Sequence, residues 1–135
     1  MPGELILLVE DNDNNRMLVR DVLHASGYRV VEAETAEDSL RIAAEQRPAL
    51  ILMDIQLPGM NGIEALKRLR DDPATRAIPV IAVTASAMTQ DRRQIMAAGF
   101  DGYQSKPISV KGLLQTIREM LPSLGDATSH LSGPA

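Results

Sequence analysis

The stretch ALILMDIQLPGMNG (49–62) decides the fold of this chain. Five apolar residues run into Asp54, and a segment rich in Pro, Gly and Asn follows them. The next residues place Ile63, Leu66 and Leu69 on one face of a helix. A continuous apolar run is typical of a parallel strand that is covered on both faces. The stretch therefore predicts a strand, a loop and a helix, which is the repeating unit of an α/β fold.

Other segments of the chain also end on polar residues. They are LILLV (5–9) before Glu10 and Asp11, IPVIAV (78–83) before Thr84, and the segment 101–105 before Lys106 and Pro107. Open α/β sheets place their ligand site at the carboxyl ends of the strands. If these segments are parallel strands, three acids, a hydroxyl and an ammonium converge at one edge of the sheet. This convergence is the main indication of function.

The whole chain alternates between short apolar runs and amphipathic helical patterns. The expected strands are about 4–9, 28–33, 49–53, 79–83 and 101–104. The first helix is expected to bury Leu18, Val22 and Ala25. The last helix has the clearest periodicity, with Val110, Leu113, Leu114, Ile117 and Leu121 on one face. Five strand–helix units predict the α/β class, with a doubly wound, five-stranded parallel sheet that carries helices on both faces.

Composition limits the class of protein. The chain has 135 residues, a formal net charge of -4 and no cysteine. One ordinary domain fits this length, a disulfide framework is excluded, and the charge gives no basic footprint for nucleic acid. No apolar stretch approaches the roughly 18 residues that a membrane-spanning helix needs. We expect one domain over 1–121, a flexible C-terminal tail over 122–135, no membrane insertion and a cytoplasmic location.

Glu10, Asp11 and Asp54 are the candidate metal ligands. Two like charges about 4 Å apart cost roughly 4 kcal/mol at an effective dielectric of about 20, and a divalent cation removes this cost. Mg²⁺ prefers oxygen ligands and keeps waters that a phosphate can displace. Any one of the acids alone would also fit a strand that simply ends in solvent. Three acids together with a lysine favour Mg²⁺.

Asp54 is the candidate phosphoacceptor, because aspartate carboxylates form aspartyl-phosphate intermediates. Lys106 and a metal ion would neutralise the incoming phosphoryl group, and the Thr84 hydroxyl would donate to one of its oxygens. Taken singly, Thr84 also fits a β-branched strand end, and Lys106 fits a solvated lysine. The bond between Lys106 and Pro107 is open to the cis or the trans isomer. Tyr103 fits either half-buried strand packing or a switching role.

Four motifs in one order carry a resemblance to a known family. They are VEDN (9–12), LILMDIQLPGMNG (50–62), VIAVTA (80–85) and SKP (105–107). Together they resemble the receiver domain of two-component response regulators, in the CheY-like superfamily, over about residues 4–121. The segments IQLPGMNG, TASAM and YQSKPIS are most similar to single-domain regulators of the DivK type and to receivers attached to hybrid histidine kinases.

This resemblance implies a fold and a metal site. The fold is flavodoxin-like, with strand order 2-1-3-4-5. Asp54 matches the phosphoacceptor of the family, and Mg²⁺ is its cofactor. The implied metal ligands are Glu10, Asp11, Asp54 and the backbone carbonyl of Gln56.

The resemblance also implies a switch and its partners. Thr84 and Lys106 match the pair that senses the phosphate, and Tyr103 matches the aromatic residue that turns inward when the phosphate recruits Thr84. The phosphoryl donor would be a sensor histidine kinase or a histidine phosphotransferase. A downstream regulatory protein would bind the face made by the fourth helix, the fifth strand and the fifth helix.

Other classes of function fit less well. A phosphohydrolase with an aspartate nucleophile needs a second Asp two residues on, where this chain has Gln56. Neither GxxxxGK[ST] nor GxGxxG follows the first strand, which counts against a nucleotide-binding module. The complete set of acids, Thr84 and Lys106 counts against a receiver-like domain that serves only for interaction. His24 and His130 lie in no phosphotransfer pattern. We therefore predict a phosphorylated switch and not an enzyme, apart from weak self-catalysed phosphorylation and dephosphorylation.

Overall fold

The computed structural model describes residues 3–57, 59–85, 89–106 and 108–121. In these ranges it forms one sheet of five parallel strands, in the order β2-β1-β3-β4-β5. The strands are β1 (Leu5–Val9), β2 (Arg29–Ala33), β3 (Leu50–Asp54), β4 (Val80–Thr84) and β5 (Gly102–Ser105). The predicted strand order is therefore confirmed.

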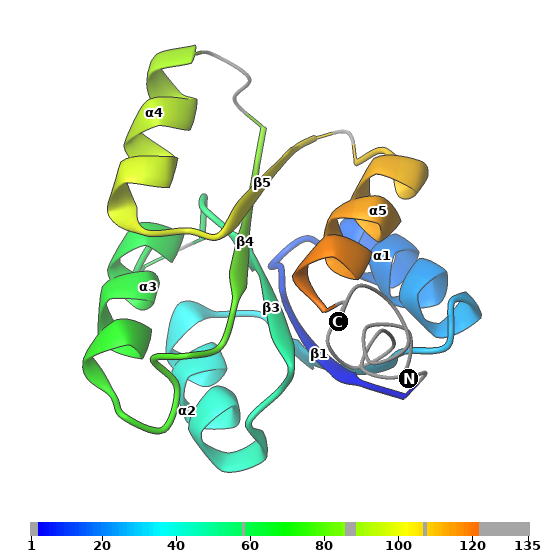
Figure 1. Cartoon of the computed structure of the whole chain (residues 1–135), viewed down its shortest axis with the longest axis horizontal. Coiled ribbons are helices and arrows are strands. Elements are labelled where there is room, and N and C mark those ends of the chain that lie inside the picture. The colour runs from blue at the N-terminus through cyan, green and yellow to red at the C-terminus, as the bar shows by residue number, and fades with distance from the viewer. Residues whose placement is uncertain (1–2, 58, 86–88, 107, 122–135) are drawn as a thin grey trace, which may run out of the picture.

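Within the described ranges, five helices cover the two faces of this sheet. They are α1 (Asp13–Ala25), α2 (Ala36–Gln46), α3 (Gly62–Asp71), α4 (Thr89–Ala98) and α5 (Val110–Met120). Helices α1 and α5 lie on one face, and α2, α3 and α4 lie on the other (Figure 1). Right-handed crossovers impose this division, because the strand order reverses direction beside β1.

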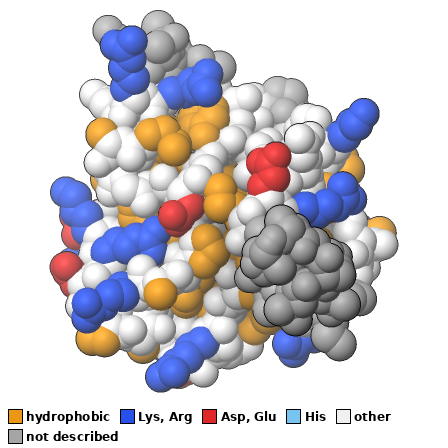
Figure 2. All heavy atoms as spheres, in the orientation of Figure 1, with side chains coloured by type: hydrophobic (Ala, Val, Ile, Leu, Met, Phe, Trp, Pro, Cys, Tyr) orange, Lys and Arg blue, Asp and Glu red, His pale blue; other side chains and the backbone are white. Residues whose placement is uncertain are grey.

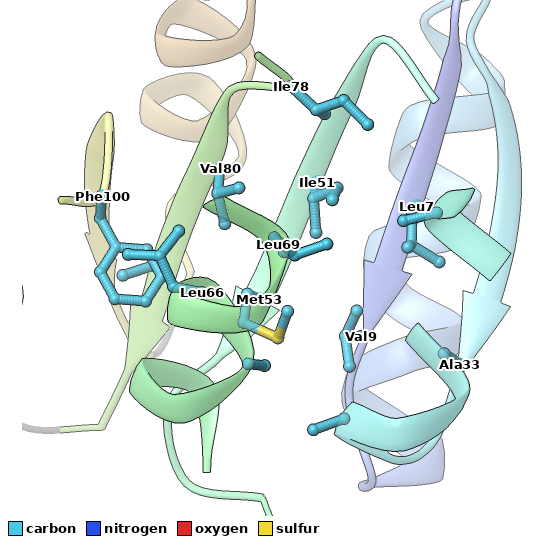
Figure 3. Packing of buried hydrophobic residues seen from close by; sticks show 14 of the residues in the cluster. Leu7, Val9, Ala33, Ile51, Met53, Leu66, Leu69, Ile78, Val80 and Phe100 are labelled. Atoms are coloured by element: carbon cyan, nitrogen blue, oxygen red, sulfur yellow. The ribbon is translucent and has the colours of Figure 1, made fainter. Parts of the chain in front are cut away.

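Side chains of the central strands alternate between two buried cores. Leu7, Ile51 and Val80 point into the core beneath α2, α3 and α4 (Figure 3). Ile6 and Leu52 belong to the core beneath α1 and α5. Strands β3 and β4 are buried along their whole length. Cover on both faces explains why their sequences are continuously apolar.

Helix α3 anchors the core that lies next to the end of β3. Leu66 and Leu69 are buried there together with Met53 and Phe100 (Figure 3). Truncation of such a leucine to alanine usually costs about 2–5 kcal/mol, because the neighbours fill the cavity only in part. This packing gives the acid at the end of β3 a rigid base.

All five strands begin one residue later than expected. β3, β4 and β5 also end one residue later than expected. The reason is that the backbone ladder continues through the polar residues at the strand ends. Asp54 pairs with Val83, and Thr84 pairs with Ser105. Two of the candidate site residues are thus held inside the sheet and not in the loops that follow it.

The predicted apolar face of α1 is wrong. Val19 and Leu23 are buried, whereas Leu18 is 55% exposed and Ala25 is exposed. Val22 lies half-buried at the edge of the contact. Both sets of residues have helical spacing, so periodicity alone could not choose between them. The packing of α1 against the sheet selects the face that carries Val19 and Leu23.

None of the helices in the described part of the chain has the length and apolar character that crossing a bilayer requires. On the face of the molecule that Figure 2 shows, the Lys and Arg side chains lie in separate groups, among acidic and apolar side chains.

Three expectations fall outside the described residues. They concern the tail (122–135), the isomer of the bond before Pro107, and His130.

Candidate functional site

Polar residues from different strands converge on one edge of the sheet, as the sequence predicted. Asp54 ends β3 and is 2% exposed, and Glu10 follows β1 and is 4% exposed. Lys106 follows β5, and its Nζ lies 2.9 Å from Oε1 of Glu10 and 3.0 Å from Oδ2 of Asp54. Thr84 is buried at the end of β4. One ammonium therefore bridges two buried carboxylates that come from separate strands.

Burial shifts the pKa values of the charged groups in this cluster. It raises the pKa of the Glu10 carboxyl above its usual value; the hydrogen bond from Lys106 opposes this rise, and the neighbouring Asp54 adds to it. Burial by itself would lower the pKa of the Lys106 ammonium. Its hydrogen bonds to Glu10 and Asp54 outweigh that effect and raise the pKa. The lysine is thus held in its charged form, whereas burial and the neighbouring Asp54 disfavour the ionised form of Glu10.

The three acids form a group that could hold a metal ion. Glu10, Asp11 and Asp54 each offer a carboxylate oxygen, and these oxygens lie within 4.8 Å of one another. Glu10 and Asp54 are buried, whereas Asp11 is exposed. A donor set made only of carboxylate oxygens suits a hard cation such as Mg²⁺ and not zinc. The residues therefore fit the ion that the sequence predicted.

The loop after β3 fixes the direction of the Asp54 carboxylate. The backbone N–H of Gln56 donates to Oδ1 of Asp54 at 2.9 Å, and Lys106 donates to Oδ2. Each oxygen of the carboxylate thus has a donor. The side chain of Gln56 is exposed. The role of the Gln56 backbone carbonyl as a metal ligand stays a prediction.

Gly62 is part of the site, although it was not predicted from the sequence. A Cβ atom on Gly62 would lie 2.6 Å from the carbonyl oxygen of Asp54 and 2.9 Å from Cα of Ile55. The N–H of Gly62 donates to the carbonyl of Ile55 at 3.0 Å. Only glycine lets α3 begin so close to the end of β3. In the sequence, the signal for this role was the final glycine of the segment rich in Pro, Gly and Asn that follows Asp54. Glycine is common in any loop, so this signal was not specific.

The turn after β1 is held through each polar group of Glu10. Its N–H donates to the carbonyl of Ala33 at 3.0 Å, and its Oε2 accepts from the N–H of Asn12 at 3.2 Å. Its carbonyl oxygen accepts from Nη1 of Arg16 at 3.0 Å. Asn12 also caps α1 by accepting from the N–H of Asn15. Neither Asn12 nor Arg16 was singled out from the sequence, where they fit an ordinary helix start.

Thr84 and Tyr103 lie on the neighbouring strands β4 and β5. The carbonyl of Thr84 accepts from the N–H of Lys106 at 2.7 Å, which ties the ends of β4 and β5 together. Tyr103 is half-buried against the core beneath α4, and its ring centre lies 5.3 Å from the guanidinium carbon of Arg92. Packing and switching both remain compatible with this position, so the switching role of Tyr103 stays a prediction.

Comparison with known proteins decides the family. Residues 6–118 match the model of the response regulator receiver domain. The chain belongs to this family. This receiver is 48% identical over 122 residues to the polar-differentiation response regulator DivK of Brucella anthropi, a match that covers 90% of this chain and 97% of that protein. DivK of Brucella ovis matches with the same identity and coverage.

Solved receivers have the same fold. The receiver domain of the sensor histidine kinase PA1611 from Pseudomonas aeruginosa has a TM-score of 0.83 and 36% identity, over 90% of this chain and 99% of that one. That structure has a magnesium ion coordinated in its active site cleft. The chemotaxis response regulator CheY4 of Vibrio cholerae has a TM-score of 0.82 and 27% identity, over 88% and 99% of the two chains. The CheY-like receiver fold is confirmed, and family membership implies histidine kinases as partners.

Proposed function

We propose that this receiver is a single-domain response regulator of a two-component phosphorelay. It takes a phosphoryl group on Asp54 from a sensor histidine kinase or a histidine phosphotransferase, with Mg²⁺ bound beside it. The observation that carries the proposal is the ammonium of Lys106, which lies between Glu10 and Asp54 at the edge of an acidic trio. A lysine and a divalent cation on either side of Asp54 can neutralise an incoming phosphoryl group. The magnesium ion in the PA1611 receiver supports the choice of metal.

The chemistry of the transfer follows from the position of Asp54. One carboxylate oxygen attacks phosphorus, the bond from phosphorus to the donor histidine nitrogen breaks, and its electron pair stays on that nitrogen. The hydrogen bonds from Gln56 and Lys106 orient the carboxylate before the donor arrives. Mg²⁺, when bound, neutralises charge on the phosphoryl oxygens. In this proposal its ligands are Glu10, Asp11, Asp54 and the backbone carbonyl of Gln56.

Thr84 and Tyr103 then connect the modification to the surface. Phosphorylation adds charge and acceptor oxygens to Asp54, and the strand that Thr84 ends pairs with β3. A hydrogen bond from the Thr84 hydroxyl to the phosphoryl group would draw the end of β4 toward it. Tyr103, in the neighbouring β5, would turn inward. A downstream protein that binds the resulting face of α4, β5 and α5 more tightly in one state converts the modification into a signal.

Labelling with acetyl phosphate in the presence of Mg²⁺, followed by intact-mass measurement, tests the proposal. We expect one phosphoryl group, stable in acid and labile in base, that is absent from Asp54→Asn. Asp21→Asn is the matched control, because Asp21 is an exposed acid of α1 and should leave labelling unchanged. Labelling that persists in Asp54→Asn contradicts the assignment. A native protein that takes no phosphate, while another receiver does so in parallel, indicates a domain used only for interaction.

We expect no turnover of a separate substrate, apart from weak self-catalysed phosphorylation and dephosphorylation. Gln56 occupies the position where an aspartate-nucleophile phosphohydrolase has its second Asp. Sustained release of phosphate from an aryl phosphate by the native protein, lost in Asp54→Asn, contradicts this expectation. The cytoplasmic location stays a prediction.

A further inference from the structure

Arg16 joins three segments that surround the acidic residues of the site. Its Nη1 donates to the carbonyl oxygen of Glu10 at 3.0 Å, at the end of β1. Its Nε donates to Oε1 of Glu32 in β2 at 3.2 Å, and its Nη2 donates to Oδ1 of Asp13 in α1 at 2.6 Å. Oε1 of Glu34 lies 3.7 Å from Nη1. The side chain of Arg16 is only 15% exposed, so these contacts hold it inside the junction of the three segments.

The bond from Arg16 to the Glu10 carbonyl bears on the neighbouring acid, Asp11. The carbonyl of Glu10 and the N–H of Asp11 belong to the same planar peptide unit. Other partners already fix the N–H and the carboxylate of Glu10. Arg16 fixes the carbonyl as well, and with it the peptide plane from which the exposed Asp11 carboxylate extends.

We infer that Arg16 is a positioning residue for the metal site, which orients Asp11 toward Mg²⁺ by holding the Glu10 carbonyl. This inference rests on the proposed function. A purely electrostatic role for Arg16 has the opposite consequence, because a guanidinium repels a nearby divalent cation and its removal should tighten metal binding. Positioning requires that removal of Arg16 weakens metal binding. The sign of the change therefore separates the two roles.

Arg20 provides a matched control from the next turn of α1. It lies 3.3 Å from Oδ1 of Asp21 and 3.8 Å from Oε2 of Glu32, so it shares the Glu32 carboxylate with Arg16. Arg16→Met and Arg20→Met remove the same charge from the same helix. Only Arg16→Met also removes the hydrogen bond to the Glu10 carbonyl.

The test is a titration of each full-length protein with MgCl₂, followed through amide chemical shifts by NMR. We expect Arg16→Met to raise the dissociation constant for Mg²⁺ about tenfold, as is usual when a residue that orients metal ligands is lost. Arg20→Met should bind Mg²⁺ as the native protein does, or more tightly. At saturating Mg²⁺, the rate of labelling by acetyl phosphate should be the same in Arg16→Met and the native protein. The substitution should therefore raise the concentration of Mg²⁺ that labelling requires, without changing the rate of labelling at saturation.

Each outcome bears on a different statement. A native protein that does not bind Mg²⁺ overturns the proposed function and this inference with it. Native binding together with equal or tighter binding by Arg16→Met overturns the inference alone. If circular dichroism shows Arg16→Met to be unfolded, Arg16→Lys decides, because a lysine keeps the charge but lacks the fork that serves Glu10, Glu32 and Asp13 together. Weaker binding by Arg16→Lys supports positioning, and native affinity overturns it.

Discussion

Nζ of Lys106 lies 3.0 Å from Oδ2 of Asp54, although the two residues are 52 positions apart in the chain. The same ammonium lies 2.9 Å from Glu10, so it ties the ends of β1, β3 and β5 together at one edge of the sheet. In the unmodified protein it compensates two buried carboxylates. A phosphoryl group on Asp54 would compete for this ammonium. Lys106 therefore stabilises the resting state, and in the proposed function it also senses the modified one.

Replacement of Lys106 by Met should destabilise the metal-free protein. The substitution leaves Glu10 and Asp54 buried without their shared cation, and we expect a loss of about 2 kcal/mol in the free energy of unfolding. Mg²⁺ should restore part of the loss, because it supplies positive charge to the same acids. Urea unfolding with and without Mg²⁺ measures both effects. Lys67→Met, at an exposed position of α3, should change the stability by less than about 0.5 kcal/mol. A Lys106→Met protein as stable as the native one without Mg²⁺ contradicts the bridging role.

As the pH falls, binding of Mg²⁺ should begin to weaken at a higher pH than it would if Glu10 had the pKa of an ordinary glutamate. Burial, together with the nearby Asp54, raises the pKa of Glu10 above its usual 4.5 in the folded protein. Protonated Glu10 therefore contributes stability to the metal-free fold below the pKa of the unfolded chain. That contribution is lost as the pH rises through the higher folded pKa. A proton and Mg²⁺ compete for the same carboxylate, so metal binding falls as Glu10 takes up its proton.

The measurement for Glu10 is the rise in thermal midpoint that Mg²⁺ produces, followed from neutral pH downward. In the native protein we expect this rise to begin its decline well above pH 4.5, at a pH where an ordinary glutamate would still be largely ionised. Glu10→Gln removes both the titrating group and a ligand, so its rise should be smaller at neutral pH and should show less pH dependence in this range. A native profile that declines only over the same pH range as that of Glu10→Gln contradicts the raised pKa of Glu10.

The strands could be predicted from the sequence, but the buried face of the first helix could not. Strands β3 and β4 are covered on both faces, and this burial explains their continuous apolar runs. Helix α1 carries two candidate faces with helical spacing, one with Leu18 and one with Val19 and Leu23. Contacts with the sheet make the choice between these faces, and those contacts have no counterpart in the local sequence.

The chemistry of the site was likewise predictable only where it depends on residue type. Asp54 ends one extended segment and Lys106 follows another, and parallel strands bring their carboxyl ends together. Gly62 and Arg16 instead act on backbone atoms. A Cβ atom on Gly62 would lie 2.6 Å from the Asp54 carbonyl oxygen, and Nη1 of Arg16 lies 3.0 Å from the carbonyl oxygen of Glu10. A close approach to a backbone carbonyl leaves no pattern of side chains along the chain, so these two residues emerged only from the three-dimensional arrangement.

Gly62→Ala should disturb the phosphoacceptor. The new Cβ would lie 2.6 Å from the Asp54 carbonyl oxygen, and backbone on both sides would have to shift. We expect a loss of about 1–3 kcal/mol in stability and slower labelling by acetyl phosphate. Gly112→Ala in α5 is the control, because its nearest neighbour lies at 3.4 Å and alanine favours a helix by up to about 1 kcal/mol. If Gly62→Ala is as stable as Gly112→Ala, the close approach of α3 to β3 is not a constraint.

Tyr103 should change its exposure when Asp54 is phosphorylated. The chain has two tyrosines, so Tyr28→Phe leaves Tyr103 as the single tyrosine reporter. In the unmodified protein the half-buried ring faces the guanidinium of Arg92, a contact worth about 0.5–1 kcal/mol at an exposed site. An inward turn gives up this contact and should reduce quenching of tyrosine fluorescence by acrylamide. Thr84→Ala should accept the phosphoryl group without this change, since it lacks the hydroxyl that the phosphoryl group would recruit before the ring turns inward. Equal quenching in labelled and unlabelled protein means that Tyr103 serves as strand packing and that another residue reports the modification.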